Sequence, residues 1–558
     1  MNILTILSMI GGLALFLYGM HILGEGLAKL SGGKLETFLS KMTDTPLKGV
    51  LLGAGTTAVI QSSSATTVMV VGFVNSGIMQ LKQAVGIIMG ANIGTTITSW
   101  ILSLSGIESD SVFVMLLKPE AFSPILAIVG VFFLMFSKSE QKREAGGILL
   151  GFAILMFGMD TMSTAVEPLK NVPAFTQLFV AFSNPFIGIL TGTILTAIIQ
   201  SSSASIGILQ ALCATGTVSF SAALPIIMGQ NIGTCITALL SSVGANTNAK
   251  RAAFIHLYFN IIGTTVFTGA FYLVHAFFPF AFLNQIATPA GIAIIHSCFN
   301  VTATILLLPF SQQLVRFAKL SVPEKSSAPK QKLPPELTAL SHMDRRFLDN
   351  PPFALKQCKT ATGGMLSLAG ETAEKTILLI SDYSEKKADA VKKLEHYVDL
   401  YEDKINNYLF EISQYPLSKS DSKELSLMQH CLGNIERIAD YSLDVAIRIK
   451  KMKKKKLSFS KDAKEDLALY HEIVLALVKN TIHYWETYDT IAANDAFRLE
   501  NERSRIEKRI TKNHKKRLKK EKCSVDMGFI LSDILLGLKK IAEHCIRIID
   551  VVQSAHLD

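Results

Sequence analysis

The chain has 558 residues, of which 49% are hydrophobic and 18% charged, and its formal net charge at pH 7 is +10. Only 24 of its Lys, Arg, Asp and Glu residues lie in residues 1–320, so the composition predicts a membrane domain followed by a soluble domain. The seven cysteines are scattered and show no C-x-x-C spacing, which argues against a disulfide framework and a zinc site.

Apolar runs long enough to cross a bilayer, about 17 to 25 residues, recur through the first domain. They lie at 2–20, 84–104, 121–137, 146–163, 223–243, 253–275 and 290–310. The first run has no basic residue before it and no small-residue cleavage site after it, so we expect a retained transmembrane helix and not a signal peptide.

A repeat with a single offset of 139 residues organises this domain. It places "VIQSSSATTV" (59–68) on "IIQSSSASIG" (198–207), and "IMGANIGTTIT" (88–98) on "IMGQNIGTCIT" (227–237). Solenoid periods are only about 20 to 50 residues, so this repeat predicts a duplicated transmembrane bundle. We therefore predict an all-α polytopic membrane domain with repeats at about 1–139 and 140–278 and a final helix at 290–310, all within 1–312.

Loop charge predicts that the two copies are inverted, because short cytoplasmic loops are rich in Lys and Arg. The loop at 31–49 holds three lysines and the loop at 105–120 is mainly acidic, whereas in the second copy 171–188 is uncharged and 244–251 ends in two basic residues. With the N-terminus outside, every basic loop lies on the cytoplasmic side. This arrangement requires each Gln-Ser-Ser-Ser segment to return to the side it came from, as a re-entrant hairpin or two helices.

The apolar stretches beside the first Gln-Ser-Ser-Ser cluster, at 49–60 and 65–74, predict helices of only about 15 to 18 Å. We expect broken half-helices that meet near the midplane, as in the binding site of a secondary transporter. Half-helix N-termini suit an anion, and hydroxyl, amide and carbonyl oxygens suit a hard cation such as sodium. Ordinary helix packing is the alternative, since Ser, Thr and Gly are common at transmembrane interfaces.

Other polar residues inside the predicted spans are candidates for ion binding or gating. They are Asp160, His256, Asn260, His296 and Asn300. In "HLYFN" (256–260) and "HSCFN" (296–300) the His and Asn lie four residues apart on one helix face. Hydrogen bonding between helices explains these two pairs equally well.

At its paired motifs, roughly residues 1–310 resemble the type II sodium-phosphate cotransporter family, whose hallmark is two Gln-Ser-Ser-Ser motifs in inverted repeats. The resemblance implies that inorganic phosphate is carried with sodium ions by alternating access between the repeat halves. It also implies that phosphate and sodium bind at Gln61, Ser62, Ser63, Ser64, Thr66, Asn92, Thr95, Thr98, Gln200, Ser201, Ser202, Ser203, Asn231, Thr234 and Thr237.

The last part of the chain predicts a linker at 313–352 and a helical bundle at 353–558, with about six helices in two sets of three. At "GNIERIADYSLDVA" (433–446) and "LYEDKI" (400–405) the bundle resembles the PhoU domain of bacterial phosphate regulation. The resemblance implies a cytosolic regulatory role and a divalent metal held by acidic residues. Here the matching residues are Glu402, Asp403, Glu436, Asp440 and Glu543.

Two features of the bundle limit these assignments. In "LKKIAEHC" (538–545), Lys539 stands where the first carboxylate of the second metal motif would be, which puts a complete second metal cluster in doubt. The basic runs at 450–456 and 515–522 contain no aromatic residues, so we expect no nucleic-acid binding. Contact with anionic lipid and a solvated helix end both explain these runs.

These patterns predict a multi-pass protein of the bacterial plasma membrane that carries phosphate with sodium and is regulated by a cytoplasmic C-terminal domain. Phosphate export, and a phosphate sensor without turnover, are the alternatives, and the sequence leaves a homo-oligomer open. No enzyme is expected, because Gln-Ser-Ser-Ser-Ala is not the Gly-x-Ser-x-Gly of a nucleophile elbow. No Walker sequence supports an ATP-driven pump either.

Overall fold

The fold was analysed in a computed structural model. It describes residues 3–31, 45–106, 119–213, 215–324, 334–348, 350–521 and 523–557. Within these residues the chain is helical, apart from turns, connecting segments and an isolated bridge between Ser219 and Ile286. Most of the loops at 31–49 and 105–120, whose charges predict the orientation of the copies, lie outside the described residues.

The chain divides into two compact units. The first comprises Met1–Ala328 and Asp344–Asn350, and the second comprises Pro329–Met343 and Pro351–Asp558. Part of the segment predicted as a linker, 313–352, is helical in the described residues. It holds most of α16 (Ser311–Ser321) and the short 3₁₀ helices η5 (Pro335–His342) and η6 (Arg345–Phe347).

The first unit contains the apolar helices of the membrane domain. Besides α16, its α-helices are α1 (Ile3–Ser31), α3 (Pro46–Ile60), α4 (Ser63–Ser76), α5 (Leu81–Ser103), α7 (Pro119–Phe136), α8 (Glu140–Val166), α9 (Pro173–Phe182), α10 (Pro185–Ile199), α11 (Ser202–Cys213), α12 (Phe220–Gly233), α13 (Cys235–Ser241), α14 (Thr247–Phe277) and α15 (Pro289–Leu307). Among the described residues, 6 segments are long and apolar enough to cross a membrane. The predicted run at 121–137 forms the shorter α7 and is not among them.

Helices of the two repeat copies correspond under the same sequence offset. α3 and α10 have the same length and start 139 residues apart, and α4 and α11 also start 139 residues apart. The match is less close at α5, whose counterpart is divided into α12 and α13. The duplication predicted from the sequence is therefore present in the fold.

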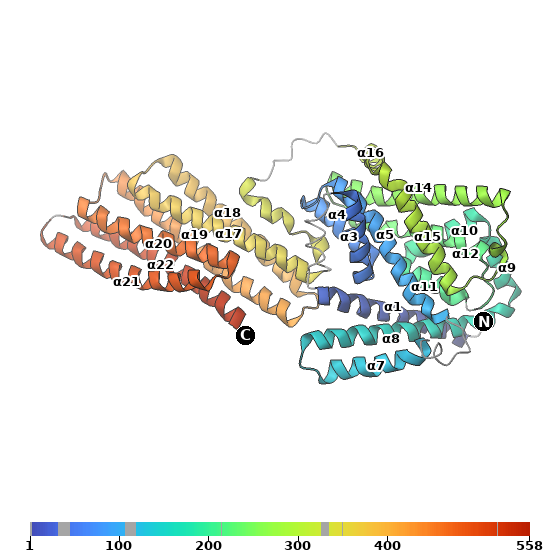
Figure 1. Cartoon of the computed structure of the whole chain (residues 1–558). Coiled ribbons are helices and arrows are strands. Elements are labelled where there is room, and N and C mark those ends of the chain that lie inside the picture. The colour runs from blue at the N-terminus through green and yellow to red at the C-terminus, as the bar shows by residue number, and fades with distance from the viewer. Residues whose placement is uncertain are drawn as a thin grey trace. The chain divides into compact units, whose positions relative to one another are not determined.

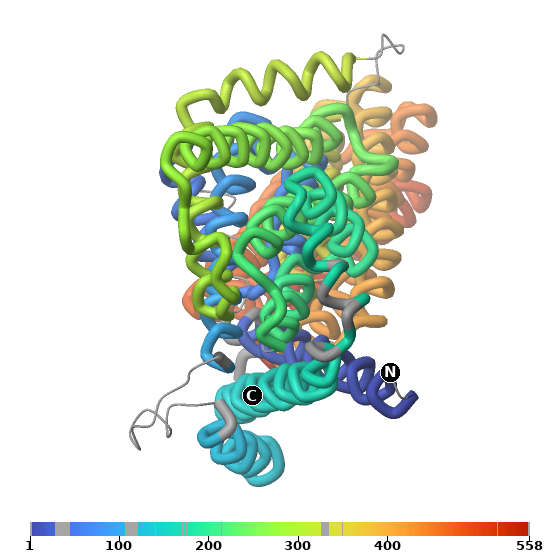
Figure 2. Tube along the Cα trace, turned by 90° about the vertical axis from the view of Figure 1, so that its right-hand side faces the viewer, coloured from blue at the N-terminus to red at the C-terminus, as the bar shows by residue number. Residues whose placement is uncertain are grey.

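The packing of α1 against α8 shows that the copies are inverted. A Cβ on Gly12 would lie 3.0 Å from the carbonyl oxygen of Gly158, and one on Gly19 would lie 2.7 Å from that of Gly151. Since Gly151 and Gly158 are the repeat equivalents of Gly12 and Gly19, equivalent helices pack with their glycines in opposite order. Figures 1 and 2 show these two helices side by side. Antiparallel packing of equivalent helices is what an inverted repeat produces.

The second unit is a bundle of six long helices within the described residues, as the sequence predicts. They are α17 (Pro351–Ser381), α18 (Glu385–Ser413), α19 (Lys419–Lys454), α20 (Lys461–Thr487), α21 (Thr490–Lys519) and α22 (Val525–Leu557). The first three contact one another, and so do the last three, while α19 packs along α22 to join the two sets (Figure 1).

Candidate functional site

Each Gln-Ser-Ser-Ser cluster lies at a break between two half-helices, as the sequence predicts. α3 ends at Ile60 and α4 begins at Ser63, and α10 and α11 repeat this break. At the breaks, Gln61 and Gln200 both adopt the left-handed conformation, each with a φ of 58°. A left-handed residue commonly ends a helix, as at Tyr488 in the bundle, and the two glutamines do so at equivalent positions of the repeat.

The serine after each glutamine closes the N-terminus of the second half-helix. The Ser62 hydroxyl accepts a hydrogen bond from the Ala65 amide at 3.1 Å, and the Ser201 hydroxyl accepts one from Ala204 at 3.2 Å. These contacts satisfy one of the free amides at each helix start. The other free amides of both starts remain available to an anion.

A hydroxyl pair ties the two half-helices together in both copies. Thr57 Oγ1 donates to Thr66 Oγ1 at 3.0 Å, and the equivalent Thr196 Oγ1 donates to Ser205 Oγ at 2.8 Å. Thr66 is among the ligands that the resemblance implies, and its hydroxyl takes part in this tie. The sequence motifs did not single out Thr57, Thr196 and Ser205, although the repeat offset pairs Thr57 with Thr196.

The two breaks lie next to each other, although they are far apart in sequence. Ser64 Oγ donates to the carbonyl oxygen of Gln200 at 3.5 Å, and Thr237 Oγ1 donates to Ser64 Oγ at 3.4 Å. Both contacts are long and therefore weak. They nevertheless place the polar residues of the first copy against those of the second.

Three serines at the breaks have hydroxyls without a partner among the described residues. Ser63, Ser202 and Ser203 are each at most 6% exposed. None of the three Oγ atoms is among the fully buried side-chain atoms that lack a partner in the described residues. These hydroxyls are therefore free to hydrogen-bond a ligand.

The glutamines of the two copies differ in their surroundings. Gln61 is buried, its Oε1 accepts a hydrogen bond from Thr98 Oγ1 at 2.9 Å, and its amide nitrogen donates to the Ala58 carbonyl. The equivalent Gln200 is exposed. Thr237, the equivalent of Thr98, donates instead to Ser64 Oγ and to the Thr234 carbonyl.

The polar side chains of the repeated sequences at 88–98 and 227–237 form hydrogen bonds within their own helices. Asn92 Nδ2 donates to the Ile88 carbonyl and Asn231 Nδ2 to the Ile227 carbonyl, at 3.0 and 2.8 Å. The Thr95 and Thr234 hydroxyls donate in the same way to the carbonyls four residues before them. These bonds use the donors and leave the side-chain oxygens as acceptors.

The glycines Gly94 and Gly233 of the sequences at 88–98 and 227–237 allow close helix contact. A Cβ on Gly94 would lie 2.5 Å from the Ala54 carbonyl oxygen, and one on Gly233 the same distance from that of Thr193. In the second copy Gly233 is also the last residue of α12, so the helix is broken there.

The two His-Asn pairs are fully buried on α14 and α15. Asn260 Nδ2 and Asn300 Nδ2 donate to the carbonyls of His256 and His296 at 3.0 and 2.9 Å, while both Asn Oδ1 atoms have no partner. His296 Nδ1 bonds the Ser99 hydroxyl at 2.7 Å. A hydrogen bond between helices thus accounts for His296 Nδ1, whereas the Oδ1 atoms of Asn260 and Asn300 have no partner among the described residues.

The sequence analysis overlooked a threonine that extends both pairs. Thr264 and Thr304 lie four residues after the Asn residues, and both are buried. The pattern His-x-x-Phe-Asn-x-x-x-Thr therefore occurs twice, at 256–264 and 296–304. Asp160, by contrast, is exposed on α8 and takes no part in either polar group.

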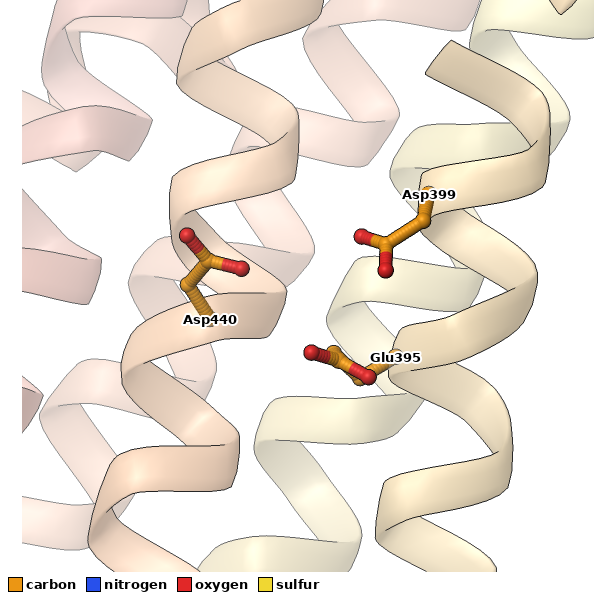
Figure 3. A group of neighbouring side chains, drawn as sticks. All are labelled: Glu395, Asp399 and Asp440. Atoms are coloured by element: carbon orange, nitrogen blue, oxygen red, sulfur yellow. The ribbon is translucent and has the colours of Figure 1, made fainter. Parts of the chain in front are cut away.

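A cluster of carboxylates lies between α18 and α19 of the bundle. Oxygens of Glu395, Asp399 and Asp440 all lie within 4.8 Å of one another (Figure 3). Burial raises the pKa of Glu395, and the neighbouring Asp399 and Asp440 raise it further. Burial is also the main cause that raises the pKa of the two aspartates. A cation placed between these groups would relieve their repulsion.

This cluster overlaps only in part with the predicted metal residues. Of the predicted metal residues, Asp440 belongs to this cluster. Burial is the main cause that raises the pKa of Glu402 and Glu436, and Asp399 and Asp440 are among the carboxylates that raise it further. Asp403 is exposed, and Glu543 is paired with Lys540 at 2.8 Å. Glu395 and Asp399 were missed, although Glu395, Asp399 and Glu402 have the spacing of one helix face.

Comparisons with known proteins match both units. The sequence profile of a family described as Na+/Pi-cotransporter matches residues 15–164 and 154–285, and that of the PhoU domain matches 363–449. No solved structure matches the chain significantly.

Curated relatives cover most or part of the chain. "Uncharacterized protein YqeW" of Bacillus subtilis is 32% identical over 327 residues, which are 58% of this chain and 100% of the relative. "Putative inorganic phosphate export protein YjbB" of Escherichia coli K12 is 24% identical over 92% of this chain and 91% of its own length. "Sodium-dependent phosphate transport protein 2A" of Rattus norvegicus is 35% identical over 106 residues, 18% of this chain and 16% of that protein.

Proposed function

The chain belongs to the Na+/Pi-cotransporter family and carries a PhoU domain, and from this premise we propose that it moves inorganic phosphate across the membrane together with sodium ions. It is a multi-pass membrane transport protein and not an enzyme. The observation that carries the proposal is the pair of adjacent helix breaks, each with a left-handed glutamine and a polar half-helix N-terminus.

The ligand assignment follows from what each group can offer. Phosphate accepts hydrogen bonds, so we assign it to the free amides at the starts of α4 and α11 and to the hydroxyls of Ser63, Ser202 and Ser203. Sodium needs oxygen ligands, which the predicted glutamine, asparagine and threonine side chains supply. The unpartnered Oδ1 atoms of Asn260 and Asn300 are further oxygen donors for a cation.

The direction of transport is a separate question, because a gradient-coupled carrier has no direction written in its residues. The printed name of one relative refers to phosphate export and that of another to sodium-dependent phosphate transport. We propose sodium-coupled uptake in a bacterial plasma membrane, with the N-terminus outside and the bundle in the cytoplasm. Net export, and a sensor that binds phosphate without turnover, are the competing functions.

Radiolabelled phosphate flux in proteoliposomes separates the three functions. We expect uptake with an inward sodium gradient and none with an equal potassium gradient. Efflux from phosphate-loaded vesicles without a sodium requirement would favour the exporter. Phosphate binding without flux in either direction would favour the sensor and overturn the proposal.

For the bundle we propose regulation of this transport, with a divalent cation bound at Glu395, Asp399 and Asp440. The close approach of three carboxylates, all with a raised pKa, supports a cation there. Scanning calorimetry of the wild-type chain and of Asp440→Asn, with and without Mn²⁺, tests this site.

A further inference from the structure

The chain crosses between its two units in an unusual order. Residues 329–343 belong to the second unit, Asp344–Asn350 to the first, and the chain from Pro351 onward to the second again. A short piece of the first unit is therefore joined at both ends to residues of the helical bundle. We call residues Asp344–Leu348 the docking segment.

An aromatic side chain anchors the docking segment on α4. Phe347 is fully buried, and its ring centroid lies 5.3 Å from that of Phe73. Its ring occupies the space beside Gly72, where a Cβ would lie only 2.7 Å from Phe347 Cε1. The missing side chain at position 72 is thus what makes room for the ring.

Polar contacts next to Phe347 extend the docking to the second repeat copy. Asn75 Nδ2 donates to Asp344 Oδ2 at 2.6 Å, and Asp344 pairs with Arg346 at 2.9 Å. Arg346 Nε donates to the Ser241 carbonyl at 2.8 Å. The Asn246 amide, in turn, donates to Asn75 Oδ1 at 2.8 Å. The network joins the ends of α4 and α13 to the start of α14.

The Asp344–Arg346 pair is largely removed from solvent, with side-chain exposures of 6% and 17%. Charges in such a place are costly unless they are paired and hydrogen-bonded, and here both have further partners on α4 and α13. Losing Asp344 would leave the Arg346 charge largely buried without its carboxylate partner. The contact is therefore specific.

The helix under the docking segment is the half-helix that begins at the candidate site. α4 runs from Ser63 to Ser76, so its docked end lies about 15 to 20 Å from the Gln-Ser-Ser-Ser break. Alternating access requires the half-helices to change their exposure during transport. A clamp on the far end of α4 opposes that change.

We infer that the docking segment is a latch through which the helical bundle regulates transport, and that the docked state slows the movement of α4. This inference rests on the proposed phosphate transport. A conformational change in the bundle would reach the docking segment, because the chain on both sides of this segment belongs to the second unit. Undocking then frees α4 without any change at the substrate site.

Two variants break the latch from opposite sides. Phe347→Ala removes the anchor, and Gly72→Ala pushes the ring out while giving α4 a better helix former. Gly55→Ala is the matched control, because it is also a glycine-to-alanine change in a half-helix of the first copy, but nothing lies within 4 Å of the added Cβ. All three are made in the full chain and reconstituted into proteoliposomes.

Hydrogen–deuterium exchange of residues 346–348 reports docking, since their amides bond to Asp344 and Arg345 in the docked segment. We expect faster exchange there in both variants, a several-fold higher phosphate flux, and no change in the control. Unchanged exchange would show that the segment is not held by Phe347. Faster exchange with unchanged or lower flux would show a merely structural contact. Either result overturns the latch.

The exchange readout does not depend on transport, so the two proposals fail separately. If wild-type protein shows no phosphate flux under any gradient, the proposed function fails and the regulatory inference fails with it, whatever the exchange shows. If wild-type flux is present and only the variants behave otherwise than expected, the latch alone fails.

Discussion

The two Gln-Ser-Ser-Ser breaks have the same backbone but different side-chain surroundings. Both glutamines are left-handed, both following serines cap a half-helix, and both breaks are tied by an equivalent hydroxyl pair. Yet Gln61 is buried against Thr98 while Gln200 is exposed. The repeat thus gives both copies the same backbone at the break, while the surroundings of the glutamine differ.

This difference fits a carrier caught on one side of its cycle. In an inverted repeat, each copy adopts in one state the arrangement that the other adopts in the opposite state. We therefore expect Gln200 to become buried against Thr237 when Gln61 becomes exposed. The bundle shows another kind of difference, because the PhoU domain profile matches residues 363–449 in its first half only.

The largest expected effect concerns the close helix contacts beside the two breaks, which are the same in both copies. A Cβ on Gly90 would lie 2.0 Å from the Val50 carbonyl oxygen, and one on Gly229 the same distance from that of Ile189. We expect Gly90→Ala and Gly229→Ala each to abolish folded protein, measured as the monodisperse yield in detergent. Gly55→Ala is the control, since nothing lies within 4 Å of its Cβ. Normal yield from one of the two variants would show that these contacts are not equivalent in the two copies.

The next effect concerns the free serines of the site. We expect Ser63→Ala and Ser202→Ala each to lower sodium-dependent phosphate flux at least about tenfold, since a hydrogen bond to a charged group contributes about 1.5 to 3 kcal/mol. Folding and membrane insertion should be intact. Ser76→Ala is the matched control on α4, because its hydroxyl bonds only carbonyls of its own helix. Unchanged kinetics in both site variants would refute the ligand assignment.

A smaller effect would sharpen the difference between the copies. Thr98→Val leaves Gln61 Oε1 unpaired and should disfavour the present state, while Thr237→Val should disfavour the opposite one. The readout is maleimide labelling of Gln200→Cys, which is exposed in this state, with the wild-type chain as the background for its own cysteines. We expect slower labelling with Thr98→Val and faster labelling with Thr237→Val, each by about threefold to tenfold for a cost of about 1 kcal/mol. Shifts in the same direction would contradict the exchange of roles.

The sequence was sufficient for the parts of the fold that repeat. The 139-residue offset, the short apolar stretches and the bundle periodicity predicted the duplication, the half-helices and the six bundle helices. It could not predict that Thr66 serves a tie and that Gln61 and Gln200 differ, because such facts depend on which helices become neighbours. The motif match that gave Glu543 as a ligand likewise could not show that Lys540 lies beside it.

The smallest effect tests the two halves of the bundle. The first half brings three carboxylates together, of which only Asp440 has a printed ion pair, with Arg437 at 3.4 Å, whereas Lys539 and Lys540 both lie within 4.0 Å of the single carboxylate Glu543 in the second half. We expect Mn²⁺ to raise the unfolding temperature of the bundle transition by a few degrees, because a ligand that binds only the folded state stabilises it. Asp440→Asn should abolish this shift, and Glu371→Gln, which loses an exposed ion pair with Lys375, should keep it. If Asp440→Asn keeps the full shift, the metal binds elsewhere and the three carboxylates only repel one another. In that case Asp440→Asn should unfold at a higher temperature than the wild type at pH 7 without any metal. Scanning calorimetry with and without Mn²⁺ on the same three proteins distinguishes these results, since the metal site predicts a loss of the shift and simple repulsion predicts a gain in the metal-free protein.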